Sequence, residues 1–136
     1  SKAAPVIKKL GIEPISMGYL VVEPGMRVGE VGHAECVPRD RPDLAVGYAM
    51  AAEMLGMGLV YLEAGSGAPV PVPPEMVRQV RASVSIPVIA GGGITSPEQS
   101  RAAVEAGADI VVTGTVVERS EDVEDALRSI IEAIRV

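Results

Sequence analysis

The sequence predicts an α/β fold of the (βα)8 TIM-barrel type, with about the last four βα units present. Short apolar runs alternate with helical patterns along the chain, and no linker divides it. Strands this continuously apolar are typical of a parallel sheet covered on both faces. An open doubly wound sheet fits the same alternation, but a barrel needs eight strands and about 250 residues. If the fold is a barrel, residues 1–136 are only its carboxyl-terminal half.

The first half of the chain predicts two helices and two strands. Apolar residues at helical spacing predict a helix over 3–10, and a buried strand follows over 17–22. A glycine-rich loop then leads to a helix over 40–54, with Asp40 as its N-cap and proline in its first turn. The apolar run 59–62 predicts the second strand.

The second half continues the alternation. A helix begins at Pro74, and residues 86–90 predict the third strand. A Ser-x-x-Gln capping box with proline at the first helical position begins a helix over 96–107. Residues 109–112 predict the fourth strand. The final helix is expected to bury one apolar face: Val123, Ala126, Leu127, Ile130, Ile131 and Ile134.

Composition restricts the function classes. The chain has 12 Lys and Arg against 18 Asp and Glu, a net charge of −6, and only 2% aromatic residues. This balance argues against a nucleic-acid surface, which needs clustered cations and stacking rings. No apolar run approaches the roughly 20 residues of a transmembrane helix. The single Cys36 allows no internal disulfide, so we expect a cytoplasmic protein.

Glycine-rich turns follow three consecutive strands: 63–67, 91–93 and 113–115. Ligands of α/β folds collect at the carboxyl ends of the strands, and glycines let backbone amides approach an anion closely. One such turn is more often just a tight connection. Two turns on adjacent final strands match the phosphate site often built at that place in barrels, so we expect a phosphate-binding domain.

Tyr61 and Glu63 lie two residues apart at the end of a strand and therefore share a face. Alone, the pair would be interpreted as a core tyrosine and a loop-capping carboxylate. Beside a phosphate site, Glu63 is better interpreted as a hydroxyl acceptor or general base. Ser66 is about equally well interpreted as a ligand-binding residue and as a hydrogen-bond partner of the loop amides.

Other candidates carry weaker signals. His33, Glu35 and Cys36 have too few ligands at too irregular a spacing for a metal site, so a solvated loop is the better interpretation. Arg39 is a candidate to reach a substrate anion. Asp40 is expected to cap the following helix.

These motifs resemble a known family. The strings Y-L-E-A-G-S-G-A at 61–68, P-P-E-M at 73–76, G-G-G-I at 91–94 and T-G-T-V-V-E at 113–118 occur in matching order and spacing. They resemble the geranylgeranylglyceryl phosphate synthases, archaeal enzymes of the wider prenylglyceryl phosphate synthase family. The resemblance covers essentially the whole chain.

The resemblance implies a modified TIM barrel, a prenyltransferase that joins sn-glycerol 1-phosphate to geranylgeranyl diphosphate in ether-lipid biosynthesis. It implies Glu63 and Tyr61 as catalytic residues. It also implies Mg²⁺, with ligands expected in an absent amino-terminal half and none in this chain, and either a homo-oligomer or association with the missing half. Carried over by position, the sn-glycerol 1-phosphate site is Tyr61, Leu62, Glu63, Ala64, Gly65, Ser66, Gly67, Gly92, Gly93, Gly114 and Thr115.

Two alternatives stay open at this point. One is a barrel that isomerises or synthesises a sugar phosphate. The other is a non-catalytic half-barrel that binds phosphate and assembles with a partner chain. Under the leading interpretation, the isolated chain is expected to be inactive.

Overall fold

A computed structural model describes residues 2–135 as a four-stranded parallel sheet with helices. The strands are β1 (Met17–Val21), β2 (Leu59–Glu63), β3 (Val88–Gly91) and β4 (Ile110–Val112), and they pair in the order β1-β2-β3-β4. The predicted α/β class is confirmed, because sequential strands pair in parallel through helical connections. β1 and β4 form the two edges of the sheet.

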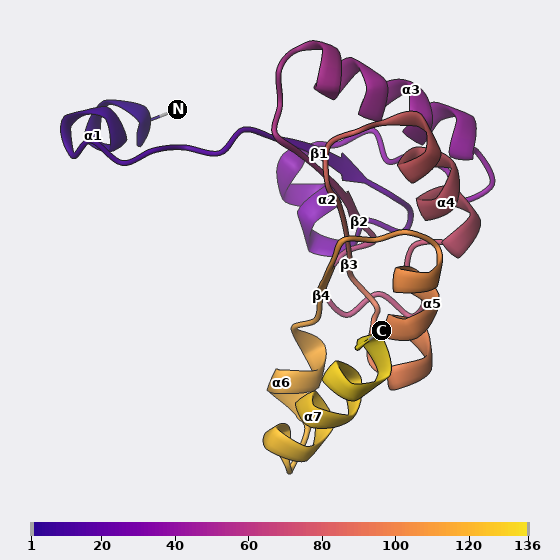
Figure 1. The fold of residues 1–136 in the computed structure, drawn as a ribbon. Helices are drawn as coiled ribbons and strands as arrows, with labels where there is room; N and C mark the ends of the chain where they lie inside the picture. Colours follow the sequence, from indigo (N-terminus) through magenta and orange to yellow (C-terminus); the bar gives the residue numbers. More distant parts are fainter. Residues whose placement is uncertain (1, 136) are drawn as a thin grey trace.

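Three helices lie side by side along one face of the sheet: α3 (Pro42–Met54), α4 (Pro74–Ser83) and α5 (Pro97–Glu105) (Figure 1). The core forms between this helical layer and the sheet, where Val60, Leu62 and Val88 are fully buried. Small residues at 45, 49 and 52 let α3 approach the strands closely, and all three are buried alanines.

The opposite face of the sheet is largely open, which corrects the expectation that both faces are covered. Met17 and Tyr19 on β1, and Ile110 and Val112 on β4, are each at least 36% exposed. Only β3 is buried along its whole length. Four strands are too few to close into a barrel, so side chains on this face have no facing layer within the described chain.

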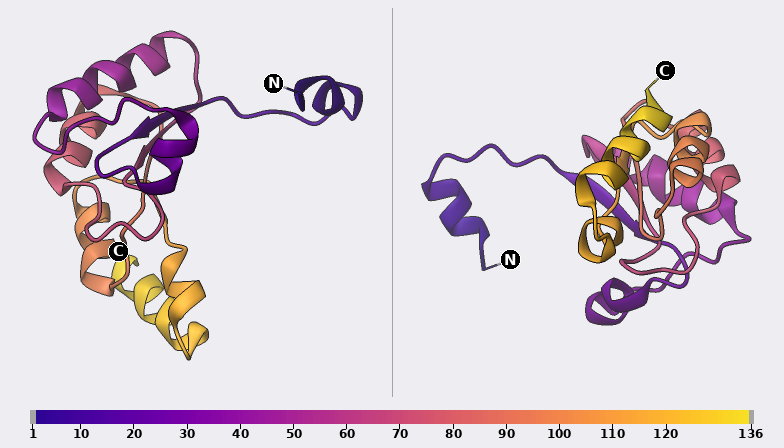
Figure 2. Two further views of the ribbon diagram at one scale, coloured as in Figure 1. Left: turned by 180° about the vertical axis from the view of Figure 1, so that it is seen from behind. Right: turned by 90° about the horizontal axis from the view of Figure 1, so that it is seen from below.

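Two short helices were not expected from the sequence. The loop after β1 contains α2 (Met26–Gly32), and α6 (Thr115–Arg119) follows β4 directly. The first predicted helix is confirmed as α1 (Ala4–Lys9). It buries no residue and lies away from the sheet at the end of an extended segment, as both views in Figure 2 show.

Two details of the predicted helices were wrong. The N-cap of α3 is Arg41 rather than Asp40, and no side chain caps this helix. The final helix α7 (Val123–Ile134) buries only Ile130 of its predicted apolar face, and Ile131 is 45% exposed. It packs on α5 and α6 instead of on the sheet, so only part of its apolar stripe meets another element.

Within residues 2–135, no helix combines the length and apolarity needed to cross a membrane.

The capping box predicted at the start of α5 is present. The Ser96 hydroxyl accepts a hydrogen bond from the Gln99 amide, and the Gln99 side chain accepts from the amides of Thr95 and Ser96. This arrangement fixes the point at which the chain leaves the turn after β3 and enters α5.

Replacing Ser96 by alanine is therefore expected to destabilise the fold by about 1 kcal/mol, the usual contribution of such a cap. Chemical denaturation monitored by circular dichroism measures the change. Ser129→Ala is the matched control, because that hydroxyl only donates to the Asp125 carbonyl within α7. Equal stability of the two variants would contradict the role of the cap.

Candidate functional site

The turns that follow β2, β3 and β4 meet around one pocket of about 150 Å³. Parallel strands end at the same edge of a sheet, so turns that are distant in sequence become neighbours there. The lining residues all belong to the ends of these strands and the turns after them: Tyr61, Glu63, Ser66, Gly92, Gly93, Ile94, Val112, Thr113, Gly114 and Thr115. None of them is Lys or Arg.

Glu63 is the one carboxylate of this pocket lining, and its side chain is held on both oxygens. The residue is only 7% exposed. Its Oε1 accepts a hydrogen bond of 2.6 Å from the amide of Gly65, and its Oε2 accepts one of 3.2 Å from the hydroxyl of Tyr19. A buried carboxylate is costly unless its oxygens are hydrogen-bonded. The turn after β2 and the neighbouring strand β1 thus supply the partners of Glu63.

Gly92 packs directly against the turn that carries Glu63. A Cβ atom at this position would collide with Glu63 Oε1 and lie 2.5 Å from the amide nitrogen of Gly65. Its φ of +80° is also one that L-residues rarely adopt. Both constraints demand glycine, so the first effect of Gly92 is to let the β2 and β3 turns touch.

Free backbone donors gather on the other two turns. Among the hydrogen bonds formed within residues 2–135, none uses the amide of Gly92, Gly93, Gly114 or Thr115. Gly114 and Thr115 lie at the start of α6, where helical amides have no partner in the preceding turn. Gly114 is further open to its surroundings, since a Cβ built there meets nothing within 4 Å. The pocket can therefore offer several N–H groups to an anion.

One hydroxyl joins the two donor turns to each other. The Thr113 side chain donates a hydrogen bond of 2.8 Å to the carbonyl of Ile94. This bond links the end of β4 to the turn after β3. The bond thus connects the segments that carry the amides of residues 92–93 and 114–115.

The two tyrosines beside Glu63 stay protonated. Burial, reinforced by the charge and hydrogen bonding of Glu63, raises the pKa of Tyr19 to about 12. Burial and then the proximity of Glu63 raise the pKa of Tyr61 well above its ordinary value. Each hydroxyl therefore remains a donor throughout the neutral pH range.

The structure brings together seven of the site residues predicted from the sequence: Tyr61, Glu63, Ser66, Gly92, Gly93, Gly114 and Thr115. Leu62, Ala64, Gly65 and Gly67 are not among the lining residues. The Leu62 side chain is fully buried in the core. The amides of Ala64 and Gly65 already donate to the Gly91 carbonyl and to Glu63.

Sequence reasoning missed Tyr19, Ile94 and Val112; Thr113 lies in the predicted turn 113–115 but was not among the predicted site residues. Tyr19 faces Tyr61 across the paired strands, and strand periodicity alone gives no register between two strands. Val112 was available as the last residue of β4, because residues at a strand's carboxyl end can face the ligand.

The weaker candidates lie elsewhere. Arg39 donates to the carbonyls of Glu23 and Pro71, so it joins two loops. His33 ends α2. Over residues 2–135, no group of three His, Cys, Asp or Glu side chains is arranged to hold a metal ion.

Comparison with known proteins gives close relatives. Curated geranylgeranylglyceryl phosphate synthases from Thermococcus gammatolerans and Pyrococcus horikoshii are each 57% identical, over 93% and 95% of this chain. In each case the match covers 50% of the relative. The chain thus spans about half the length of the curated relatives it matches.

A solved structure agrees with this result. The (S)-3-O-geranylgeranylglyceryl phosphate synthase of Thermoplasma acidophilum, in complex with its substrate sn-glycerol-1-phosphate, superposes with a TM-score of 0.95 at 51% identity. The match covers 98% of this chain and 54% of that structure. The PcrB family matches over residues 1–134. The chain therefore belongs to the PcrB family.

Proposed function

We propose that this chain is the carboxyl-terminal half of a barrel that joins sn-glycerol 1-phosphate to geranylgeranyl diphosphate and releases diphosphate. The observation that carries the proposal is the small pocket where unused backbone amides lie beside a buried carboxylate. The relative from Thermoplasma acidophilum, whose structure holds sn-glycerol-1-phosphate, supports this choice of ligand.

The two parts of the pocket suit the two ends of that substrate. The amides of Gly92, Gly93, Gly114 and Thr115 would bind the phosphate, and no lysine or arginine is needed when several N–H groups converge. Glu63 would accept the proton of the glycerol hydroxyl as its oxygen attacks the allylic carbon. Tyr61, which shares the face of Glu63, would orient the glycerol. Binding the phosphate holds the nucleophile in place and removes its translational freedom.

Magnesium dependence is also a proposal. No carboxylate cluster suited to a divalent cation occurs between residues 2 and 135. We therefore assign no step of this chain's chemistry to Mg²⁺. We expect the Mg²⁺ ligands in the half of the relatives' barrel that lies outside the match to this chain. A cytoplasmic location and assembly into a homo-oligomer likewise remain predictions.

The proposal predicts activity when the barrel is completed. We define the complemented enzyme as this chain assembled with the half of the Thermococcus gammatolerans synthase that it does not match. With sn-glycerol 1-phosphate, geranylgeranyl diphosphate and Mg²⁺, it is expected to form geranylgeranylglyceryl phosphate, detected by mass spectrometry. This chain alone is expected to form none. If the complemented enzyme is folded but forms no geranylgeranylglyceryl phosphate, the proposal is overturned.

Glu63→Gln is expected to lower the turnover of the complemented enzyme at least about 100-fold, because the amide cannot accept the proton. The steady-state rate at saturating substrates measures this effect. Glu124→Gln serves as the control, since Glu124 forms an exposed ion pair with Arg128 on α7. A Glu63→Gln enzyme with full turnover would exclude the proposed base.

Gly92→Ala is expected to weaken sn-glycerol 1-phosphate binding about tenfold or more, measured by calorimetry. The new Cβ pushes the Glu63 turn away, and displaced donors cost about 1–3 kcal/mol each. Gly56→Ala is the matched control: its φ of +77° gives similar backbone strain, but nothing lies within 4 Å of its Cβ. Equal affinity in both variants would show that close packing at Gly92 is unimportant.

A further inference from the structure

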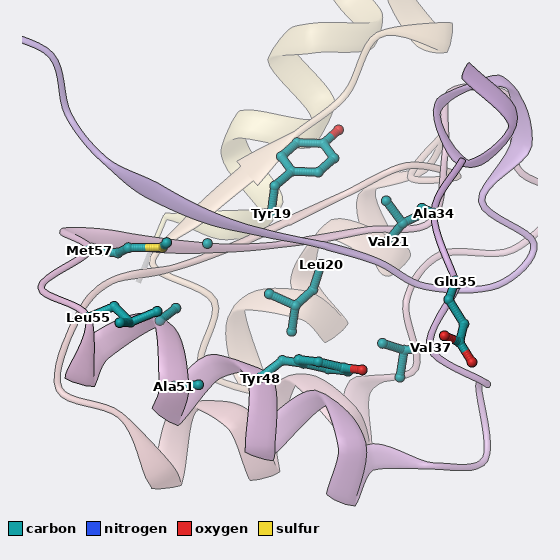
Figure 3. A pocket seen from close by; sticks show the side chains of 12 residues that line it. Tyr19, Leu20, Val21, Ala34, Glu35, Val37, Tyr48, Ala51, Leu55 and Met57 are labelled. Atoms are coloured by element: carbon teal, nitrogen blue, oxygen red, sulfur yellow. The ribbon is translucent and has the colours of Figure 1, made fainter. Parts of the chain in front are cut away.

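Tyr19 projects toward Glu63 from the edge strand β1. In the parallel register Tyr19 pairs with Tyr61, and Glu63 follows two residues later on the same face of the sheet. Figure 3 shows the Tyr19 ring on the opposite side of β1 from Leu20, whose side chain points toward α3. The Tyr19 ring therefore lies on the open face of the sheet, although the residue also contributes to the lining of the apolar cavity of about 380 Å³ beside β1 and α3.

Two contacts fix the orientation of this side chain. Its ring packs edge-on against Tyr61, with centroids 4.9 Å apart and planes at 68°. Its hydroxyl then reaches Glu63 Oε2 at 3.2 Å. Edge-to-face aromatic pairs are favourable in this geometry. The ring contact thus determines where the hydroxyl lies.

The hydrogen bond is suited to holding a base without neutralising it. The Gly65 amide restrains Glu63 Oε1 from within the same turn, and Tyr19 restrains Oε2 from another strand. A cation at this position would compete with a proton for the carboxylate. A neutral hydroxyl restrains the carboxylate without placing a positive charge beside it.

We propose that Tyr19 is a positioning residue for the reaction: its hydroxyl holds the Glu63 carboxylate in the orientation in which it accepts the glycerol proton. The proposal rests on the proposed function of Glu63. It gives the stretch of β1 around Tyr19 a role in the transfer step.

The test is Tyr19→Phe in the complemented enzyme, which keeps the ring packing and removes the hydrogen bond. We expect kcat to fall about 10- to 100-fold, as for a misplaced catalytic group. The KM for sn-glycerol 1-phosphate should change less than about threefold, because the phosphate donors are untouched. Tyr48→Phe is the control, since this exposed tyrosine on α3 lies outside the Glu63 pocket. Thermal unfolding checks that Tyr19→Phe remains folded.

A double-mutant cycle separates positioning from a general loss of structure. Combined with Glu63→Gln, Tyr19→Phe should lower the residual rate no further, because its effect acts through the carboxylate. The proposal would be overturned if the rate losses of the two single variants multiplied in the double variant. It would also be overturned if Tyr19→Phe left kcat unchanged or altered only the KM for sn-glycerol 1-phosphate. An unmutated complemented enzyme that forms no product would instead overturn the proposed function of the site, and with it this role.

Discussion

The contact between Gly92 and the turn of residues 63–65 is the constraint on which the site depends. Because residue 92 has no side chain, the end of β3 lies against Glu63 and the amide of Gly65. The same turn holds Glu63 through the 2.6 Å hydrogen bond from that amide. A carboxylate and a row of unused amides can share one small pocket only because these two turns meet without an intervening Cβ.

The parallel sheet makes that contact possible. Its register places Glu63 beside Gly91 and Gly91 beside Val112, so the three strands end level with each other. The Thr113–Ile94 bond then joins the turns that follow β3 and β4. On the other side, β1 carries Tyr19 next to Tyr61. The site is therefore assembled from strand ends, with helices α3 to α5 supporting the sheet from the far face.

Much of this arrangement could be predicted from the sequence. The alternation of apolar runs with helical patterns indicated the four strands, and the Ser96–Gln99 pattern indicated the start of α5. The glycine turns were expected to meet because parallel strands share a carboxyl edge. Helices α2 and α6 were missed for a local reason. α2 has two glycines among its seven residues, and α6 begins with Thr-Val-Val, so neither has high helix propensity.

Other features depend on tertiary structure that one sequence does not contain. The open face of the sheet follows from the number of strands available to close it. The contact of Tyr19 with Glu63 needs the register between β1 and β2, which no pattern within either strand specifies. The collision that excludes a side chain at position 92 likewise arises from packing between two turns, whereas the sequence showed only that glycine was present.

The central claim is that the amides at the ends of β3 and β4 bind the phosphate of the substrate. A titration of the complemented enzyme with sn-glycerol 1-phosphate, with this chain alone ¹⁵N-labelled, tests it by NMR. The claim predicts that the amide signals of Gly92, Gly93, Gly114 and Thr115 shift together and saturate at one affinity. Saturable binding that leaves these four signals in place, and shifts those of another surface, would contradict it.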